Sequence, residues 1–64
     1  MNKKAEMVGH PKGTLEVFED VFGNLLVQAN GTDVTSQVSG PGCDAETLLH
    51  LAAELWASGM LKLR

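Results

Sequence analysis

The sequence predicts an α+β fold, namely a three-stranded antiparallel β-meander followed by one α-helix packed on the sheet and a short C-terminal strand. Between positions 14 and 38, short segments rich in β-forming residues alternate with turn residues, and between positions 44 and 58 a longer apolar segment has helical periodicity. The chain has 64 residues, which is enough for one small domain. We assign this single α+β domain to residues 14–64.

Residues 1–13 mix charged residues with Gly9, Pro11 and Gly13 and show no sustained hydrophobic periodicity. Glycine and proline interrupt regular structure, and chain ends are poorly ordered unless other contacts hold them. We therefore predict a flexible N-terminal arm over residues 1–13, with a short extended piece at Glu6 to Val8.

Three strands are predicted next, over residues 14–20, 24–29 and 32–38. The first connection, Val21-Phe22-Gly23, has the length and the glycine of a hairpin loop. The second, Asn30-Gly31, supplies the positive φ that both central positions of a type I′ turn require. The two connections together predict a meander.

Counting outward from the two turns assigns each side chain to a face of the sheet. One face is predicted to be apolar and to carry Leu15, Val17, Val27, Ala29 and Val34. The opposite face is predicted to carry a polar row and a mixed row, respectively Glu16, Gln28 and Asp33, and Phe18, Leu26 and Thr35. This second face is half apolar, which is unusual for a surface that meets only water.

The helix is predicted to begin after Asp44, a favourable N-cap residue, and to end near Ser58. Gly59 can adopt the left-handed conformation there, with Met60 contacting Leu55 in a Schellman-like end. Apolar side chains cover an arc of about 200° on this helix, against the roughly 100° that one buried face requires. They are Ala45, Leu48, Leu49, Leu51, Ala52, Ala53, Leu55 and Trp56. Residues 60–64 then alternate apolar and basic side chains, which predicts the final strand.

A chain of this size buries only about 60% of its unfolded surface, so its core usually needs help from disulfides, a metal or association. Cys43 is the only cysteine, which excludes an internal disulfide. The helix and the half-apolar sheet face also offer more apolar surface than one small core covers. We therefore predict a homodimer, with candidate interface residues Phe18, Leu26, Leu49, Ala53 and Trp56.

Basic residues are confined to the two ends of the sequence. The 49 residues from Gly13 to Leu61 contain seven carboxylates and no Lys or Arg. Such a body repels phosphate and attracts basic surfaces, so the charges oppose direct nucleic-acid binding and favour a basic protein as an alternative partner. The candidate residues for this acidic partner face are Glu16, Asp33, Glu46 and Glu54.

Three motifs suggest chemistry, and each has a simpler interpretation. Cys43 lies at a helix start, but Asp44 opposes a thiolate there and no histidine is near in sequence, so we expect a structural cysteine. The Gly40-Pro41-Gly42 loop lacks the lysine of a phosphate-binding loop. Glu46, His50 and Glu54 share one side of the helix at i, i+4 spacing, and we interpret them as its solvated face. No catalytic, metal-binding or cofactor-binding residue is predicted.

These observations favour a small acidic, non-enzymatic protein–protein interaction module that self-associates. The alternative is an acidic inhibitor or nucleic-acid mimic of the phage type, which blocks a basic site on another protein. A third hypothesis, a small metal-binding or thiol protein, would use His50 with its two glutamates or Cys43. No apolar run approaches the roughly 18 residues of a membrane span, and the first residues lack a signal-peptide core, so we expect no membrane association and a cytoplasmic location.

Overall fold

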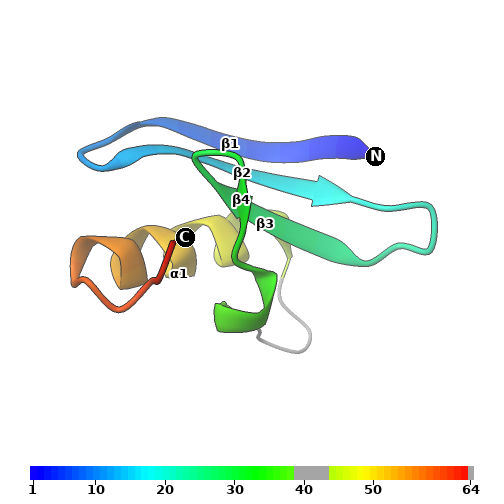
Figure 1. The fold of residues 1–64 in the computed structure, drawn as a ribbon. Coiled ribbons are helices and arrows are strands. Elements are labelled where there is room, and N and C mark those ends of the chain that lie inside the picture. Colours follow the sequence, from blue (N-terminus) through cyan, green and yellow to red (C-terminus); the bar gives the residue numbers. More distant parts are fainter. Residues whose placement is uncertain (39–43, 64) are drawn as a thin grey trace.

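The computed structural model describes residues 1–38 and 44–63 (Figure 1). Within these residues an antiparallel sheet of four strands, in the order β1-β2-β3-β4, carries the helix α1 on one face. The elements are β1 (Asn2–His10), β2 (Gly13–Glu19), β3 (Leu25–Ala29), β4 (Thr32–Asp33), the 3-10 helix η1 (Thr35–Gln37) and α1 (Ala45–Ala57). The predicted α+β class, with an antiparallel sheet and one packed helix, is confirmed. Cys43 and the Gly40-Pro41-Gly42 loop lie outside the described residues.

Strand β1 is the largest difference from the sequence-based expectation. We predicted a flexible arm over residues 1–13, but Asn2–His10 pairs antiparallel with β2 and forms one edge of the sheet. The register shifts on either side of the segment from Ala5 to Met7. Such bulges disturb the alternation of apolar and polar side chains from which a strand is recognised, and for this reason the pattern did not reveal β1.

The pairing of β2 with β3 agrees with the predicted faces. The buried pairs on the helix side are Leu15 with Ala29 and Val17 with Val27, and the pairs on the outer side are Glu16 with Gln28 and Phe18 with Leu26. The Asn30-Gly31 turn also has the expected conformation, with φ of 51° at Asn30 and 81° at Gly31. Two local turn signals therefore set the register of this hairpin pair.

The third predicted strand, over residues 32–38, is wrong beyond Asp33. The Thr35 hydroxyl accepts a hydrogen bond from the Val27 backbone N–H at 2.9 Å. If β4 continued, a backbone carbonyl of that strand would accept this bond instead. Asp33 Oδ1 in turn accepts from the Thr35 N–H at 2.9 Å and from its hydroxyl at 2.5 Å. Since side chains take over the backbone pairing, the chain turns into η1. Val34 and Val38, at the two ends of η1, are buried in the core.

The helix has the predicted ends. Asp44 Oδ1 accepts from the Thr47 N–H at 2.8 Å, as an N-cap does. At the other end Gly59 has a φ of 75°. Its N–H donates to the Trp56 carbonyl at 3.1 Å and the Met60 N–H donates to the Leu55 carbonyl at 2.9 Å. This pair of bonds is the Schellman arrangement.

The predicted C-terminal strand is not formed by the described residues Met60–Leu63. The Gln37 side chain instead binds this segment. Its amide N–H donates to the Lys62 carbonyl at 2.8 Å and its amide oxygen accepts from the Lys62 N–H at 2.7 Å. One side chain thus replaces a strand partner and holds Leu61 in the core, where it is 7% exposed.

Candidate interaction surface

Part of the interface that was predicted on α1 is buried in the core. Leu49 and Trp56 are each 3% exposed, and Ala53 is partly buried. Strand β1, expected to be an arm, packs against α1 on this side. Leu49 and Trp56 are too deeply buried to form a contact surface, whereas the partly exposed Ala53, Phe18 and Leu26 stay interface candidates.

His10 connects β1 to the helix, a role that sequence reasoning missed. Its ring stacks on Trp56 with centroids 4.7 Å apart and planes inclined by 17°. Nδ1 accepts the Lys12 backbone N–H at 3.1 Å, so Nε2 carries the ring proton and donates to the Ala53 carbonyl at 2.9 Å. His10 lies within the predicted flexible arm, and nothing in the local sequence indicates contact with a ring 46 residues away.

Among the described residues, the two most exposed large apolar side chains, Val21 and Phe22, lie at the end of the sheet where β2 connects to β3. We call the apolar surface there the hairpin end and define it by Met1, Phe18, Val21, Phe22 and Leu26. Val21 and Phe22 are 89% and 84% exposed, and Phe18 and Leu26 are half-buried on the outer face. Figure 1 shows this connection extending past the start of α1, so the helix does not cover it.

The turn at the hairpin end is held by Asp20. Its backbone N–H donates to the Asn24 carbonyl at 3.0 Å, and its carbonyl accepts from the Gly23 N–H at 3.1 Å. Its carboxylate Oδ1 accepts from the N–H groups of both Phe22 and Asn24, each at 2.9 Å. The exposed Phe22 therefore sits on a backbone that is already ordered.

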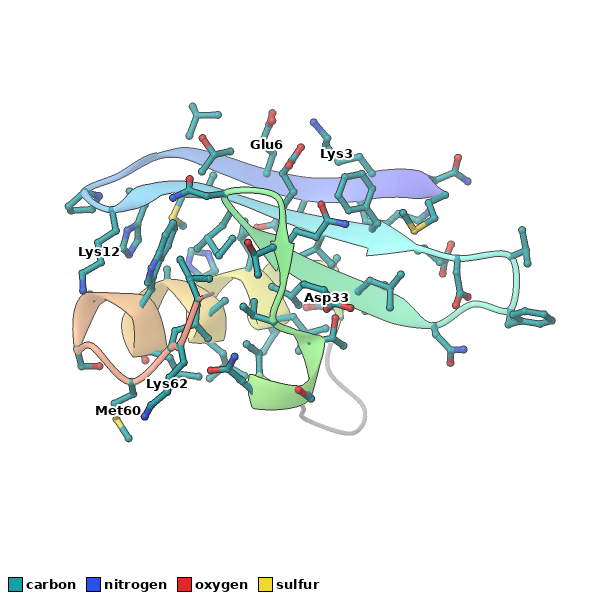
Figure 2. The ribbon with its side chains drawn as sticks, viewed as in Figure 1. Lys3, Glu6, Lys12, Asp33, Met60 and Lys62 are labelled. Carbon is teal, nitrogen blue, oxygen red and sulfur yellow. The ribbon has the colours of Figure 1, made fainter. Side chains whose placement is uncertain are left out.

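Two lysines of β1 form ion pairs with carboxylates of the sheet. Lys3 lies 2.8 Å from Glu16 and 3.0 Å from Glu6, and Lys4 lies 3.5 Å from Glu19. Figure 2 shows Lys3 and Glu6 projecting side by side from β1. Lys3 and Lys4, two of the three cations of the expected arm, thus pair with carboxylates of the acidic body. Such exposed pairs add little stability, and the two lysines offset only part of the charge of Glu6, Glu16 and Glu19.

The four predicted carboxylates of the acidic partner face do not lie together. Glu16 and Asp33 belong to the sheet, whereas Glu46 and Glu54 are exposed on α1. Glu46 lies 3.9 Å from His50 Nε2. Within residues 1–38 and 44–63, no group of three or more His, Cys, Asp or Glu side chains is arranged to hold a metal ion.

Hydrogen bonds lower the pKa of three aspartates. The Asn24 N–H is the main cause for Asp20, the Thr35 hydroxyl for Asp33, and hydrogen bonds from Thr47 for Asp44. A carboxyl whose pKa is lower in the folded chain stabilises the fold above its unfolded pKa of about 3.9, and this contribution is lost as the pH falls through the folded value. We therefore expect the urea midpoint, followed by circular dichroism, to fall steadily below about pH 4.

The substitution Asp20→Asn provides the control for this acid dependence. Asparagine keeps an oxygen that can accept the Phe22 and Asn24 N–H groups but does not titrate. The variant should remain folded at neutral pH and show a shallower loss of stability in acid. A wild-type midpoint that stays constant from pH 7 to the most acidic buffer would contradict the assignment.

Comparison with protein-family models, curated proteins and solved structures finds no match to this chain. Among the described residues, no helix has the length and hydropathy needed to cross a lipid bilayer.

Proposed function

We propose that the protein is a small non-enzymatic protein–protein interaction module that associates with a second copy of itself through the hairpin end. One observation carries this proposal: Val21 and Phe22, two adjacent large apolar side chains, are 89% and 84% exposed on a hydrogen-bonded turn. Single exposed apolar residues are common on protein surfaces. Two on one fixed turn, with Phe18 and Leu26 nearby on the same sheet end, are typical of a contact surface.

The free energy of apolar burial favours association through the hairpin end. Burial of one phenylalanine side chain contributes about 1.5–3 kcal/mol. Because Asp20 already orders the backbone of the turn, little conformational entropy is lost on binding. A 64-residue core is marginal, and an interface would add to it.

The distribution of charge favours a second copy as the occupant. The net charge of the chain is −3, so two copies repel each other unless they meet where the field is weak. The pairs that Lys3 makes with Glu16 and Lys4 makes with Glu19 offset part of the sheet's negative charge near the hairpin end, where the Asp20 carboxylate remains and accepts the Phe22 and Asn24 N–H groups. The exposed carboxylates of α1, Glu46 and Glu54, belong to the opposite layer of the fold. Two copies joined through their hairpin ends keep these groups apart.

The acidic inhibitor or nucleic-acid mimic remains the competing hypothesis, and it requires carboxylates gathered on one face. The four candidates are divided between the sheet and the helix, and Glu16 is paired with Lys3. No specific contact favours this hypothesis over self-association.

Sedimentation equilibrium at tens of micromolar tests the proposal. The wild type should contain a species of twice the 6.8 kDa chain mass, and Phe22→Ser should weaken the dimer about 100-fold or more, since each of the two copies loses about 1.5–3 kcal/mol. Val8→Ser is the matched control, since Val8 is 71% exposed near the other end of β1. A wild type that is monomeric at every concentration, or a Val8→Ser effect equal to that of Phe22→Ser, overturns the proposal.

A further inference from the structure

A groove between η1 and the second half of α1 forms a surface separate from the hairpin end. It has a volume of about 300 Å³ and is lined by Gln37, Val38, Leu51, Glu54, Leu55 and Ser58. Ligand sites in proteins start at about this volume. The groove therefore has room for one large side chain rather than for a cofactor.

The lining of the groove is fixed by hydrogen bonds. Gln37 is held by its two bonds to the Lys62 backbone, at 2.8 and 2.7 Å. The Ser58 hydroxyl donates to the Glu54 carbonyl at 2.7 Å, and the Met60 N–H donates to the Leu55 carbonyl at 2.9 Å in the Schellman end of the helix. A preformed groove loses little entropy when a ligand binds.

The chemistry of the groove is apolar with one negative edge. Leu51 is 38% exposed and Leu55 is half-buried, so neither is fully covered by the core. Glu54 is exposed beside them, and no Lys or Arg of the described residues lies within 4.0 Å of its carboxylate. Figure 2 shows the Lys62 side chain pointing outward beside Met60. Glu46, two turns earlier on the helix, adds a second negative charge along the same side.

We propose that this groove binds a segment of a partner protein in which a bulky apolar side chain is adjacent to Lys or Arg. The apolar side chain occupies the space over Leu51 and Leu55, and the cation pairs with Glu54. Charge complementarity selects this occupant, because an acidic segment is repelled by Glu54 and by the net charge of −3. The site is independent of self-association and gives the protein a second kind of partner.

The test is a titration of isotope-labelled protein with the capped dipeptide acetyl-Leu-Arg-amide, followed by amide chemical shifts. We expect saturable binding in the millimolar range, with the largest shifts at Gln37, Leu51, Glu54, Leu55 and Ser58. Acetyl-Leu-Glu-amide and acetyl-Gly-Arg-amide should each bind at least 5-fold more weakly, since one lacks the cation and the other the apolar side chain.

Two variants test the residues. Glu54→Gln should weaken acetyl-Leu-Arg-amide at least 3-fold, whereas Glu46→Gln, the matched control on the same helix, should change its affinity less than 2-fold. Equal affinity for the three dipeptides, shifts centred on another surface, or equal effects of the two variants overturns the inference. The titration is repeated on Phe22→Ser, so that loss of the dimer and loss of groove binding are observed separately.

Discussion

Replacing Trp56 with alanine is expected to lower the free energy of unfolding by about 3–5 kcal/mol, the range for large aromatic side chains in a core. Trp56 is 3% exposed and lies between the apolar cluster and the His10 ring, 4.7 Å away. Its removal leaves a cavity and takes away the surface on which His10 stacks. At roughly 0.05–0.15 kcal/mol per residue, a chain of this length has only about 3–10 kcal/mol in total. The alanine variant should therefore lose about a third or more of its total stability.

Circular dichroism during urea unfolding measures this loss, because the substitution removes the only tryptophan and with it the fluorescence signal. Trp56→Phe is the matched control and should retain most of the stability, since an aromatic ring still packs in the core and against His10. A double-mutant cycle of His10→Ala with Trp56→Leu, which removes the ring but keeps an apolar side chain, isolates the coupling of the two rings, expected at about 0.5–1.5 kcal/mol. An alanine variant as stable as the wild type would show that Trp56 is not part of the core.

Local signals predicted the parts of the fold whose causes are local. The Asn30-Gly31 turn needs only the positive φ of two residues, and the helix ends need only Asp44 and Gly59. From these, simple counting placed Val17 against Val27 and identified the faces of the sheet. Each signal acts within a few residues, so one sequence is sufficient to recognise it.

Contacts between distant residues decided the elements that sequence reasoning missed. Strand β1 depends on pairing with β2, and its bulges disturb the alternation that would have marked it. The third strand ends because the Thr35 hydroxyl takes the place of a backbone partner. The C-terminal segment alternates like a strand but is bound by Gln37, 25 residues earlier. Side-chain hydrogen bonds of this kind leave no periodic pattern in a sequence.

Only part of the candidate surface was predicted, because contacts between distant residues also decide which apolar side chains stay exposed. Phe18 and Leu26 follow from counting along a hairpin, whereas Leu49 and Trp56 of the interface predicted on α1 are buried in the core. Val21 and Phe22 were interpreted as loop residues only. Turns are usually built from Gly, Pro, Asn, Asp and Ser, so two large apolar residues in a turn were the available signal for an exposed contact surface.

Replacing Gly13 with alanine should destabilise the protein by about 2–4 kcal/mol, for two separate reasons. Gly13 has a φ of 145°, a conformation that costs other residues about 1–3 kcal/mol. A Cβ atom at this position would also overlap Oδ1 of Asn30. That side chain cannot move freely, since it accepts from the Thr14 N–H at 3.0 Å and donates to the Lys12 carbonyl at 3.2 Å. Each hydrogen bond lost contributes about 1 kcal/mol more.

Gly9→Ala is the matched control for this prediction. Gly9 lies in β1, across the same turn from Gly13, yet no atom lies within 4 Å of the position that its Cβ would take. Its substitution should change the urea midpoint by no more than the equivalent of about 0.5 kcal/mol. In an Asn30→Gly background, Gly13→Ala keeps the backbone strain but not the overlap. The free energy of unfolding that Gly13→Ala costs should therefore be smaller there than in the wild type. Equal urea midpoints for Gly13→Ala and Gly9→Ala would show that neither the backbone strain at Gly13 nor its contact with Asn30 requires glycine at this turn.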